Sequence, residues 1–512
     1  MEPSNNNFLK KVVSHAKEYG FIFPSSEIYD GLSAVYDYGQ NGVELKNNLK
    51  QYWWEAMTRM NNNIVGIDSA IFMHPTVWKA SGHVDAFNDP MIDNKDSKKR
   101  YRADVLVEDH ISKIEEKIEK EIKKLGDSFD KTKAPGPNSR IAEYQNQVDS
   151  INLQLKQVIE KNDMAGLKQL IVDLQISDPV SGTRNWTDVR QFNLMFSTEV
   201  GSLVESTDKI FLRPETAQGI FVNFLNVQKT SRMKVPFGIA QIGKAFRNEI
   251  VARQFIFRMR EFEQMEMQFF VVPNTELKWF EWWKEKRMQW HVALGLGEDN
   301  YRYYDHRNLA HYANAACDIQ YKFPMGFKEL EGIHSRTDFD LKNHEKYSGK
   351  KLQYFDSESN QSYLPYVVET SIGLDRLFLA VLSSAYKEEK IDEDNSRVVL
   401  SLPPALAPQQ VAILPLLKNV DLARIAESII QDLKFDFRCS FDDKGTIGKR
   451  YRKMDAIGTP YCVTIDHQTL EDKTVTIRNR DTMEQDRITI AEIKSYLEKN
   501  CSMRELLRKL DI

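Results

Sequence analysis

Two runs of the chain, "IAQIGKAFRNE" (239–249) and "REFEQMEMQFF" (260–270), alternate between two kinds of side chain, as β-strands do. In the second run, Met265, Met267 and Phe269 share one parity and are apolar. The other parity carries polar residues and one aromatic residue: Phe262, Gln264, Glu266 and Gln268. The pattern predicts a β-hairpin with one face in the core and a polar platform on the other face.

The platform and the basic loop between the two runs carry residue types that bind nucleotides. The planar guanidinium of Arg247 suits a phosphate, and the ring of Phe262 suits a purine face. Arg258 in the loop could reach terminal phosphates, and Glu266, deep on the platform, could hold an ammonium group. Surface ion pairs, which contribute little individually, explain the same charges. The hairpin alone leaves both interpretations open.

The pattern along the remaining chain predicts an insertion within a strand-rich core. Residues 43–60 predict a long amphipathic helix, and the β-like segment after it ends at Pro75. In "ISKIEEKIEKEIKKL" the isoleucines form one helical stripe, and "INLQLKQVIEKN" repeats a helical pattern. These two segments predict a helical hairpin with a solvated, charged face. From about residue 185 to 385 the pattern is that of strands with connecting helices.

The proline-rich segment "SLPPALAPQQ" (401–410) predicts a linker. After it, apolar strands such as "VAILPL" alternate with helical patterns, which indicates a small α/β domain. We therefore predict four parts, which are a core formed by residues 1–108 and 176–400, a helical insertion at 109–175, a linker at 401–410 and a C-terminal domain at 411–512.

Composition excludes several classes of protein. The chain has 512 residues and a net charge of −4, so it has no global basic field, and any nucleic-acid contact must be local. The four cysteines are scattered without a CxxC pair, which argues against a zinc site or a disulfide framework and predicts a cytoplasmic protein. We see no signal-type segment and no run of about 18 apolar residues, so we expect no membrane contact.

Three other segments set charged residues in apolar surroundings. "FLRPETAQGIF" places Glu215 beside a proline, and "FKELEGIHSRTDFDL" holds Glu329 near other charged residues. "YVVETSIGLDRLFLAVL" sets Glu369 and Ser371 on an apolar strand that leads to Arg376. Each feature also has a structural explanation, such as a helix N-cap at Ser371 or a helix-end ion pair at Arg376.

These blocks carry a resemblance to the class II aminoacyl-tRNA synthetases. "FRNE…FIFRMREFEQME" resembles motif 2 of that class, "GLDRL" resembles motif 3, and the helix and strand that end at Pro75 resemble motif 1, the dimer-interface element. Further blocks, such as "VYDYGQNGVELKNN", "SRTDFDL" and "IGKRYRKMDAIGTPYCVTID", are similar to the homodimeric glycyl-tRNA synthetases. Two features depart from that family, since "ETSIGLDR" lacks the usual proline before its serine, and the insertion lacks the zinc-binding cysteines of some relatives.

The resemblance implies an α/β (α+β) fold with an antiparallel catalytic sheet, a helical insertion and an anticodon-binding C-terminal domain. It implies a ligase that joins glycine and ATP into glycyl-adenylate, releasing pyrophosphate, and then transfers glycine to the 3′ end of its tRNA, releasing AMP. It also implies a homodimer and Mg²⁺ bound with ATP, whose protein ligands we do not assign. Positioning and charge stabilisation suffice for such chemistry without a covalent enzyme intermediate.

By the same resemblance, Arg247 and Arg376 are the expected catalytic residues, and Arg376 could sandwich the adenine against Phe262. The residues expected to bind ATP are Arg247, Asn248, Glu249, Phe257, Arg258, Met259, Arg260, Glu261, Phe262, Glu329, Leu330, Gly373, Leu374, Asp375 and Arg376. Those expected to bind glycine are Arg102, Glu215, Phe262, Glu263, Gln264, Met265, Glu266, Glu369, Thr370, Ser371, Ile372 and Gly373. Glutamates suit the ammonium group, and selectivity must come from filling the space of a Cβ atom.

The residues expected to contact tRNA lie in "GKRYRKMDAIG" and are Lys449, Arg450, Arg452 and Lys453. A basic cluster suits phosphates, and Tyr451 could stack on an unpaired base, although a solvated basic face explains the same residues. For Arg253 in the hairpin loop, contact with the tRNA acceptor end, with ATP or only with water all stay open. The sequence does not reveal the role of the insertion.

Two other functions fit parts of the sequence. A synthetase-like protein that no longer charges tRNA is disfavoured, because Arg247, Arg258 and Arg376 are all present. An RNA-binding module without activity is disfavoured by the nearly neutral charge and the polar platform. Class I synthetases and P-loop NTPases are excluded, since the sequence contains no HIGH or KMSKS element and no GxxxxGK[ST].

Overall fold

The computed structural model describes residues 3–125, 139–201, 208–249, 254–306, 309, 312–390 and 396–510. The chain forms two compact units. One consists of Met1–Ser81, Phe196–Arg247 and Ala252–Ile512, and the other of Gly82–Met195 with Asn248–Val251. Among the described residues, no helix is long and apolar enough to cross a membrane.

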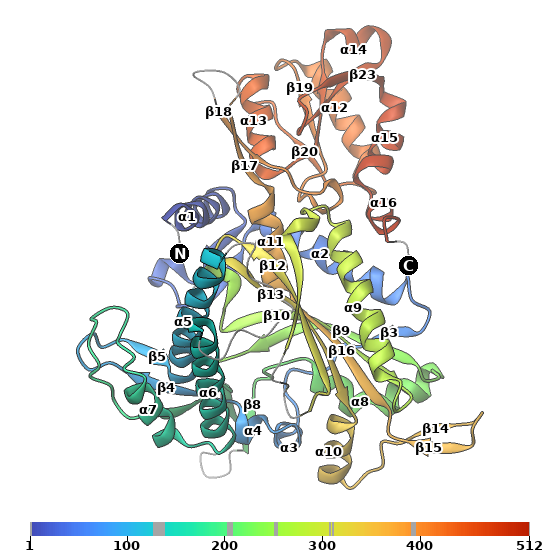
Figure 1. The fold of residues 1–512 in the computed structure, drawn as a ribbon. Helices are drawn as coiled ribbons and strands as arrows, with labels where there is room; N and C mark the ends of the chain where they lie inside the picture. The colour runs from blue at the N-terminus through green and yellow to red at the C-terminus, as the bar shows by residue number, and fades with distance from the viewer. Residues whose placement is uncertain are drawn as a thin grey trace. The chain divides into compact units, whose positions relative to one another are not determined.

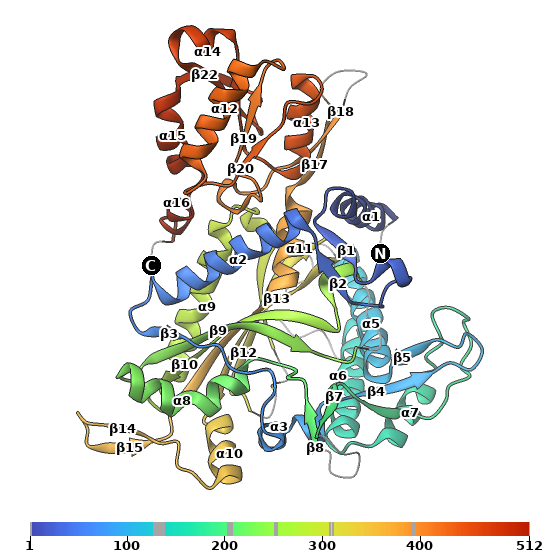
Figure 2. The ribbon, with the colours of Figure 1, turned by 180° about the vertical axis from the view of Figure 1, so that it is seen from behind.

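The larger unit is built around a seven-stranded sheet with the order β11-β12-β13-β16-β10-β9-β3 (Figures 1 and 2). Its strands are β3 (Ile64–Gly66), β9 (Phe237–Phe246), β10 (Glu261–Val271), β11 (Tyr301–Asp305), β12 (Ala315–Phe323), β13 (Gly326–Thr337) and β16 (Tyr366–Gly373). Neighbouring strands are antiparallel except β3 and β9, which are parallel. The predicted antiparallel catalytic sheet is therefore confirmed.

Strands β9 and β10 form the predicted hairpin in a register that preserves the two faces. Glu266 lies opposite Gln241, and Met265 lies opposite Ile242. On the other side of β10, Ser371 of β16 lies opposite Glu266. Because directly opposed residues share a face, three adjacent strands contribute side chains to one polar platform.

Helices cover the two faces of the sheet differently. The apolar side chains of α2 (Gln40–Thr58), α9 (Glu276–Ala293) and α11 (Leu374–Ala385) join those of the sheet in one core cluster. Helix α8 (Ala217–Ser231) covers one end of the opposite face, where Phe224 packs against Phe270 with ring centroids 4.5 Å apart. The polar platform belongs to this second face and lies toward the Phe262 end of β10.

Smaller elements of this unit surround the sheet. The helices are α1 (Pro3–Glu18), α3 (Pro75–Ala80) and α10 (Phe339–Ser348). The paired short strands are β1 (Ile22–Pro24) with β2 (Tyr36–Tyr38), β7 (Ser197–Val200) with β8 (Asp208–Phe211), β14 (Tyr354–Asp356) with β15 (Gln361–Tyr363), and β17 (Tyr386–Lys390) with β18 (Ser396–Leu400). The β17–β18 pair follows α11 directly and leads to the C-terminal part of the chain.

The C-terminal part contains a five-stranded mixed sheet with the order β20-β19-β21-β22-β23. The strands are β19 (Val411–Pro415), β20 (Cys439–Phe441), β21 (Tyr461–Ile465), β22 (Thr474–Asn479) and β23 (Gln485–Thr489). The helices are α12 (Val420–Leu433), α13 (Ile447–Ile457), α14 (His467–Asp472), α15 (Ile493–Cys501) and α16 (Met503–Leu507). The sheet and helices enclose a hydrophobic core of their own, as the sequence predicts for a small α/β domain.

The proline-rich segment 401–410 is packed rather than extended in solvent. Leu402 and Leu406 are fully buried in the main core. The amide of Asn48 on α2 donates to the carbonyl oxygens of Leu406 at 3.1 Å and Ala407 at 3.2 Å. Its carbonyl oxygen accepts from Arg438, which precedes β20 of the C-terminal domain, at 2.8 Å. The segment therefore fixes the C-terminal domain to α2.

The smaller unit combines helices with a short sheet. The helices are α4 (His83–Ala86), α5 (Ala103–Leu125), α6 (Arg140–Glu160) and α7 (Met164–Asp173). The sheet has the order β5-β4-β6, with β4 at Asn88–Asp93, β5 at Arg100–Arg102 and β6 at Arg190–Asn193. The predicted isoleucine stripe is buried, since Ile111 and Ile114 of α5 belong to the same core cluster as Val148 and Ile151 of α6.

Candidate active site

Two buried glutamates lie side by side on the polar platform, Glu266 on β10 and Glu369 on β16. The side-chain amide of Gln268 donates to Glu266 at 3.2 Å and to Glu369 at 2.6 Å. The hydroxyl of Thr216 donates to the other oxygen of Glu266. A third carboxylate, Glu215, precedes α8 and lies close enough to affect both glutamates electrostatically.

The positive charge in this cluster is concentrated on Glu369. The guanidinium of Arg336 on β13 donates to Glu369 at 3.0 Å and makes a bidentate contact with Asp340 at 2.8 and 3.1 Å. His334 contacts the other oxygen of Glu369 at 2.9 Å. No ion pair reaches Glu266 from the residues that the structure describes. The cluster therefore holds a glutamate that has hydrogen-bond donors and lacks a cation.

The two glutamates differ in their protonation. Burial, together with the negative charges of Glu369 and Glu215, raises the pKa of Glu266 well above its usual value. Burial also opposes the ionisation of Glu369, but Arg336 and His334 outweigh it and lower the pKa of Glu369 to about 2. A carboxyl that favours its protonated form thus stands beside one that favours its ionised form. A small cation that entered next to Glu266 would take the place of its proton.

Arg247 and Phe262, two residues of motif 2, contact each other. The guanidinium carbon of Arg247 lies 5.2 Å from the ring centroid of Phe262. The Nε atom of Arg247 donates to the carbonyl oxygen of Pro214 at 3.1 Å. The backbone N–H of Arg247 donates to the carbonyl oxygen of Arg260 at 2.8 Å. The predicted sandwich of an adenine between Arg376 and Phe262 stays a prediction, and in the structure the guanidinium of Arg247 lies over this ring.

Arg376 joins three segments that are far apart in sequence. Its guanidinium donates to the backbone carbonyl of Glu329 at 3.2 Å, forms an ion pair with the Glu329 carboxylate at 3.0 Å and lies 4.5 Å from the ring centroid of Phe257. Arg376 is the main cause of the lowered pKa of Glu329. The motif 2 loop, strand β13 at Glu329 and motif 3 therefore meet at one arginine.

Several residues expected to bind glycine have side chains on the opposite face of the sheet. The register pairs Met265 with Ile372 and Met267 with Thr370, and these side chains are buried in the core. Glu263, which has the same parity as Met265, pairs with lysines of α2. The predicted glycine site included every residue of two strand segments, but alternate residues of a strand face opposite sides. Glu263, Met265, Thr370 and Ile372 thus offer only backbone atoms to the platform.

A similar correction applies to residues expected to bind ATP. The side chains of Phe257, Met259, Leu330 and Leu374 belong to the main hydrophobic core. Arg260 donates to the carbonyl oxygen of Ser33 at 3.0 Å, and Glu261 pairs with Lys244 at 2.5 Å. The carboxylate of Asp375 lies on the core side of β10, near Lys46. These side chains stabilise the fold around the platform, because motif segments contain structural positions between their binding positions.

Four expected residues lie outside this part of the larger unit or the described residues. Asn248 and Glu249 belong to the smaller unit, as does Arg102, which pairs with Asp89 at 3.2 Å and Asp104 at 2.6 Å. Arg253 lies outside the described residues. Arg258 is half-buried and lines a surface pocket of 480 Å³ together with residues 30–36 and Gln254.

The structure also brings residues to the cluster that the sequence did not assign to a site. Gln268 has the parity of Glu266, so the alternation alone could have identified it. Arg336 lies in "SRTDFDL", a block that carried the family resemblance. Thr216 and Asp340 had no signal of their own, because their roles depend on how a loop and a helix pack beside the sheet.

The basic helix of the C-terminal domain, α13, divides its cations between two roles. Lys449, Arg452 and Lys453 are exposed, whereas Arg450 is buried. Arg450 donates to the carbonyl oxygens of Pro415 at 2.6 Å, Asp442 at 2.9 Å and Leu416 at 3.1 Å. The expectation that Arg450 contacts phosphate is therefore wrong, since its donors hold the ends of two strands.

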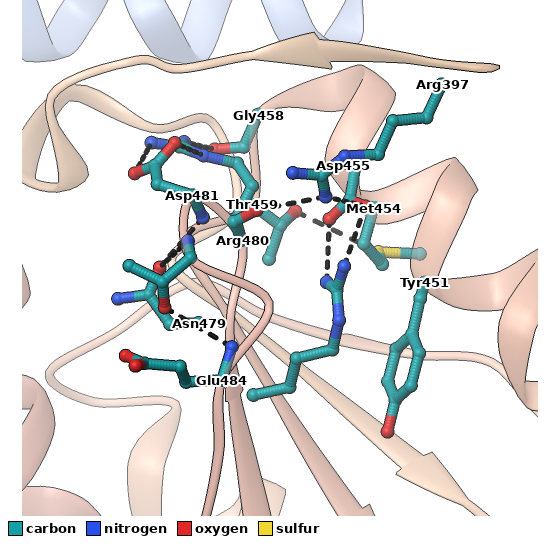
Figure 3. Close-up of polar contacts among 12 residues, drawn as sticks. Arg397, Tyr451, Met454, Asp455, Gly458, Thr459, Asn479, Arg480, Asp481 and Glu484 are labelled. Atoms are coloured by element: carbon teal, nitrogen blue, oxygen red, sulfur yellow. Dashed lines mark hydrogen bonds and ion pairs between the residues drawn. The ribbon is translucent and has the colours of Figure 1, made fainter. Parts of the chain in front are cut away.

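Tyr451 also differs from its expected role. Its hydroxyl contacts that of Thr464 at 2.6 Å, and the guanidinium carbon of Arg478 lies 4.7 Å from the Tyr451 ring centroid. Behind it, Asp455 accepts from Arg478 at 2.8 and 3.0 Å and from Arg397 of β18 at 2.8 Å (Figure 3). This buried network attaches α13 to the β17–β18 pair. Tyr451 is thus half-buried and held by these contacts, so it is not the fully exposed aromatic residue that the sequence predicted.

A search for metal-binding groups gives no candidate in the described ranges. No three His, Cys, Asp or Glu side chains there are arranged to hold a metal ion. Mg²⁺ commonly binds through substrate phosphates, waters and one or two carboxylates, so a preformed protein cage is not required for it.

Comparison with known families assigns three segments of the chain. Residues 196–385 match the tRNA synthetase class II core domain (G, H, P, S and T). Residues 89–194 match the glycyl-tRNA synthetase insertion domain 1, and residues 410–500 match an anticodon binding domain. The core match contains the platform, Arg247 and Arg376.

Curated proteins match almost the whole chain. The chain is 51% identical to the glycine–tRNA ligase of Chlorobaculum tepidum over 491 residues, which are 96% of this chain and 99% of that protein. It is 50% identical to the glycine–tRNA ligase of Staphylococcus saprophyticus, covering 96% of this chain and 98% of the relative. The enzyme of Geobacillus kaustophilus is 47% identical with the same coverage. The chain belongs to the glycine–tRNA ligase family of class II aminoacyl-tRNA synthetases.

Proposed function

We propose that this chain activates glycine with ATP and transfers it to the 3′ end of its tRNA, using the polar platform as the active site. The observation that carries the proposal is the buried carboxylate cluster of Glu266 and Glu369 on the sheet face that also carries Phe262, whose ring contacts the motif 2 arginine. A cluster with one uncompensated glutamate suits an ammonium group, and an arginine on a strand end suits a phosphate. Near full-length similarity to glycine–tRNA ligases supports the assignment of this chemistry.

The glycine ammonium binds beside Glu266 in this proposal, with Glu215 and Glu369 contributing negative charge. Glycine offers no side chain to grip, so its two charged groups supply the affinity. Larger amino acids are rejected sterically, because Ser371 lies opposite Glu266 on the neighbouring strand and occupies space near the Cα atom. Hydrolytic editing is less needed, since every competing amino acid is larger than glycine.

ATP binds between Phe262 and the two catalytic arginines. Arg247 moves from the ring of Phe262 to the α-phosphate, and its charge stabilises the transition state of adenylate formation. Arg376 exchanges its contact with Glu329 for the γ-phosphate, with Arg258 as its counterpart. Mg²⁺ bound to the nucleotide would neutralise part of the phosphate charge. The glycine carboxylate then attacks the α-phosphorus, and pyrophosphate leaves.

The exposed cations of α13 contact tRNA in the anticodon region, and the chain acts as a cytoplasmic homodimer. Lys449, Arg452 and Lys453 provide the positive charge for phosphate contacts. The motif 1 helix and strand are the elements that class II synthetases use for dimerisation, which supports the homodimer. The helical insertion receives no role in this proposal.

The deciding experiment is amino-acid-dependent exchange between ATP and pyrophosphate. Of glycine, alanine and serine, only glycine should support exchange. The same preparation should charge glycine tRNA. No exchange with any amino acid would refute the enzymatic function, and faster exchange with alanine or serine would refute the specificity. Exchange without tRNA charging would favour a synthetase-like protein that activates glycine for another acceptor.

A further inference from the structure

A buried ionic cluster lies behind the platform, on the core face of β10. Lys46 of α2 contacts the carboxylates of Glu263 at 3.1 Å and Asp375 at 3.0 Å. Lys50, one turn further along α2, contacts the other oxygen of Glu263 at 2.5 Å. Tyr38 donates its hydroxyl to Asp375. Three elements that correspond to motifs 1, 2 and 3 therefore meet at one ammonium group.

The cluster joins the start of β10 to the start of α11. One oxygen of Asp375 accepts from the backbone N–H of Glu263 at 2.8 Å, and the other accepts from Lys46. Asp375 lies in the first turn of α11, where a negative charge is also favoured by the helix dipole. Lys46 thus holds two backbone segments together through the carboxylates of Glu263 and Asp375, which are close in space but far apart in sequence.

Burial makes this arrangement sensitive to the loss of a partner. The side chains of Lys46, Glu263 and Asp375 are 8%, 9% and 4% exposed, whereas that of Lys50 is 29% exposed. Buried charges attract each other strongly, and removing one partner leaves the others uncompensated. Burial opposes the ionisation of Glu263, yet Lys46 and Lys50 outweigh it and lower its pKa. The ionised form of Glu263 is accordingly favoured by the two lysines, and Asp375 contacts Lys46 as well.

The neighbours of these carboxylates in sequence face the platform. Phe262 precedes Glu263 and shares the face of Glu266, and Arg376 follows Asp375 and contacts Glu329. A shift of either backbone segment would therefore move a residue that binds ATP in the proposed function. Misplacement of reacting groups by about 1 Å can cost about 100-fold in rate.

We propose that Lys46 is a positioning residue for adenylate formation, which sets the distance between Phe262 and Arg376 by bridging Glu263 and Asp375 on the far side of the sheet. Lys46 touches no substrate in this arrangement. Its role rests on the proposed function of the platform. Through Lys46 the geometry of the ATP site depends on α2, the helix that also contacts the C-terminal domain through Asn48.

The test compares Lys46→Met with Lys50→Met in glycine-dependent ATP–pyrophosphate exchange. The two lysines share a helix and the partner Glu263, but only Lys46 reaches Asp375, so Lys50→Met is the matched control. Lys46→Met should lower kcat/KM for ATP about 100-fold by raising KM and lowering kcat, by the positioning argument above. Lys50→Met should change it less than about threefold, because its charge is partly solvated. Equal effects of the two variants would overturn the proposal.

A second pair of variants separates positioning from folding. The double variant Lys46→Met, Asp375→Asn removes both charges of one contact and should regain thermal stability relative to Lys46→Met. Positioning predicts that its exchange activity stays low, and recovery of activity with stability would show a purely structural role. Lys46→Arg keeps the charge and should retain most of the activity. An inactive wild-type protein would refute the proposed function itself, whereas an active Lys46→Met protein would refute only this inference.

Discussion

Replacing each of the two platform glutamates by glutamine should have very different effects on stability. Glu266→Gln exchanges a carboxyl whose pKa is raised well above its usual value for a neutral amide of the same shape. Glu369→Gln removes an ionised carboxylate from Arg336 and His334, which lie at 3.0 and 2.9 Å. The chemical change is the same in both variants, and the two positions lie on neighbouring strands, so each variant serves as the control for the other.

The magnitudes follow from the partners of each group. Glu369→Gln removes one of the two carboxylates that contact Arg336 directly in a buried site, and breaking a buried pair in this way costs about 3–5 kcal/mol. Glu266→Gln breaks no ion pair within the described residues, and its cost in stability should stay below about 1 kcal/mol. Glycine binding, in contrast, should depend strongly on Glu266, because a neutral amide cannot match an ammonium group as a carboxylate does. Losing a charged hydrogen bond worth about 1.5–3 kcal/mol raises KM for glycine about 10- to 150-fold.

The pH dependence of stability distinguishes the two variants further. Glu266 binds its proton more tightly in the folded state, so its contribution is fully present below the unfolded pKa of 4.5 and is lost as pH rises through the folded pKa. Glu266→Gln should therefore gain stability relative to the wild type as pH rises. Glu369 stabilises the folded state above its unfolded pKa of 4.5, and this stabilisation is lost as pH falls toward the folded pKa of about 2. The deficit of Glu369→Gln should therefore shrink in acid.

Urea unfolding between about pH 2 and 8, which spans the titration of Glu369, and exchange kinetics with glycine check these expectations. The reasoning fails if Glu266→Gln loses as much stability as Glu369→Gln, or if its KM for glycine equals that of the wild type. A deficit of Glu369→Gln that grows in acid would contradict the assignment of the ionised carboxylate. Serine and alanine as alternative substrates show whether either variant also changes selectivity.

Three further outcomes are expected. Arg247→Ala should reduce exchange by a factor of about 100 to 1,000 with an unchanged unfolding midpoint, since its main role is on the transition state; retained exchange would refute that role. The double variant Lys449→Ala, Arg452→Ala should weaken tRNA binding and lower the salt dependence of that binding, as measured in a salt series. Arg450→Met should instead destabilise the C-terminal domain, as measured by calorimetry. Arg397→Met should lower stability by about 3–5 kcal/mol, because it removes a buried partner of Asp455; an unchanged melting temperature would contradict this.

The polar platform was predictable because a strand presents alternate residues on opposite faces. The alternation of "REFEQMEMQFF" placed Glu266 and Gln268 on one face and Met265 on the other, and the register confirms both placements. The same rule also corrects the expected glycine site, since Glu263 and Ile372 have the parity of the core. Strict use of parity within the motif segments would have removed these two residues.

Other roles depended on contacts that no local pattern contains. Arg450 and Tyr451 stand beside Lys449 and Arg452 in one basic run, yet the first two are held inside the domain. A helix of basic residues turns only part of its surface to solvent, and the sequence did not indicate which part. The proline-rich segment 401–410 predicted a linker, and only the tertiary structure shows that its leucines are buried in the main core.

The sequence by itself determined the fold class, the hairpin with its two faces, the insertion pattern and the family, because these depend on local periodicity and on motifs preserved in order along the chain. The tertiary structure alone decided which charges meet. Arg336 is shared between Glu369 and Asp340, Lys46 bridges two motifs, and Glu266 is left without a cation among the described residues. Pairing of buried charges depends on distances between segments far apart in sequence, and those distances are fixed only when the sheet and its helices pack.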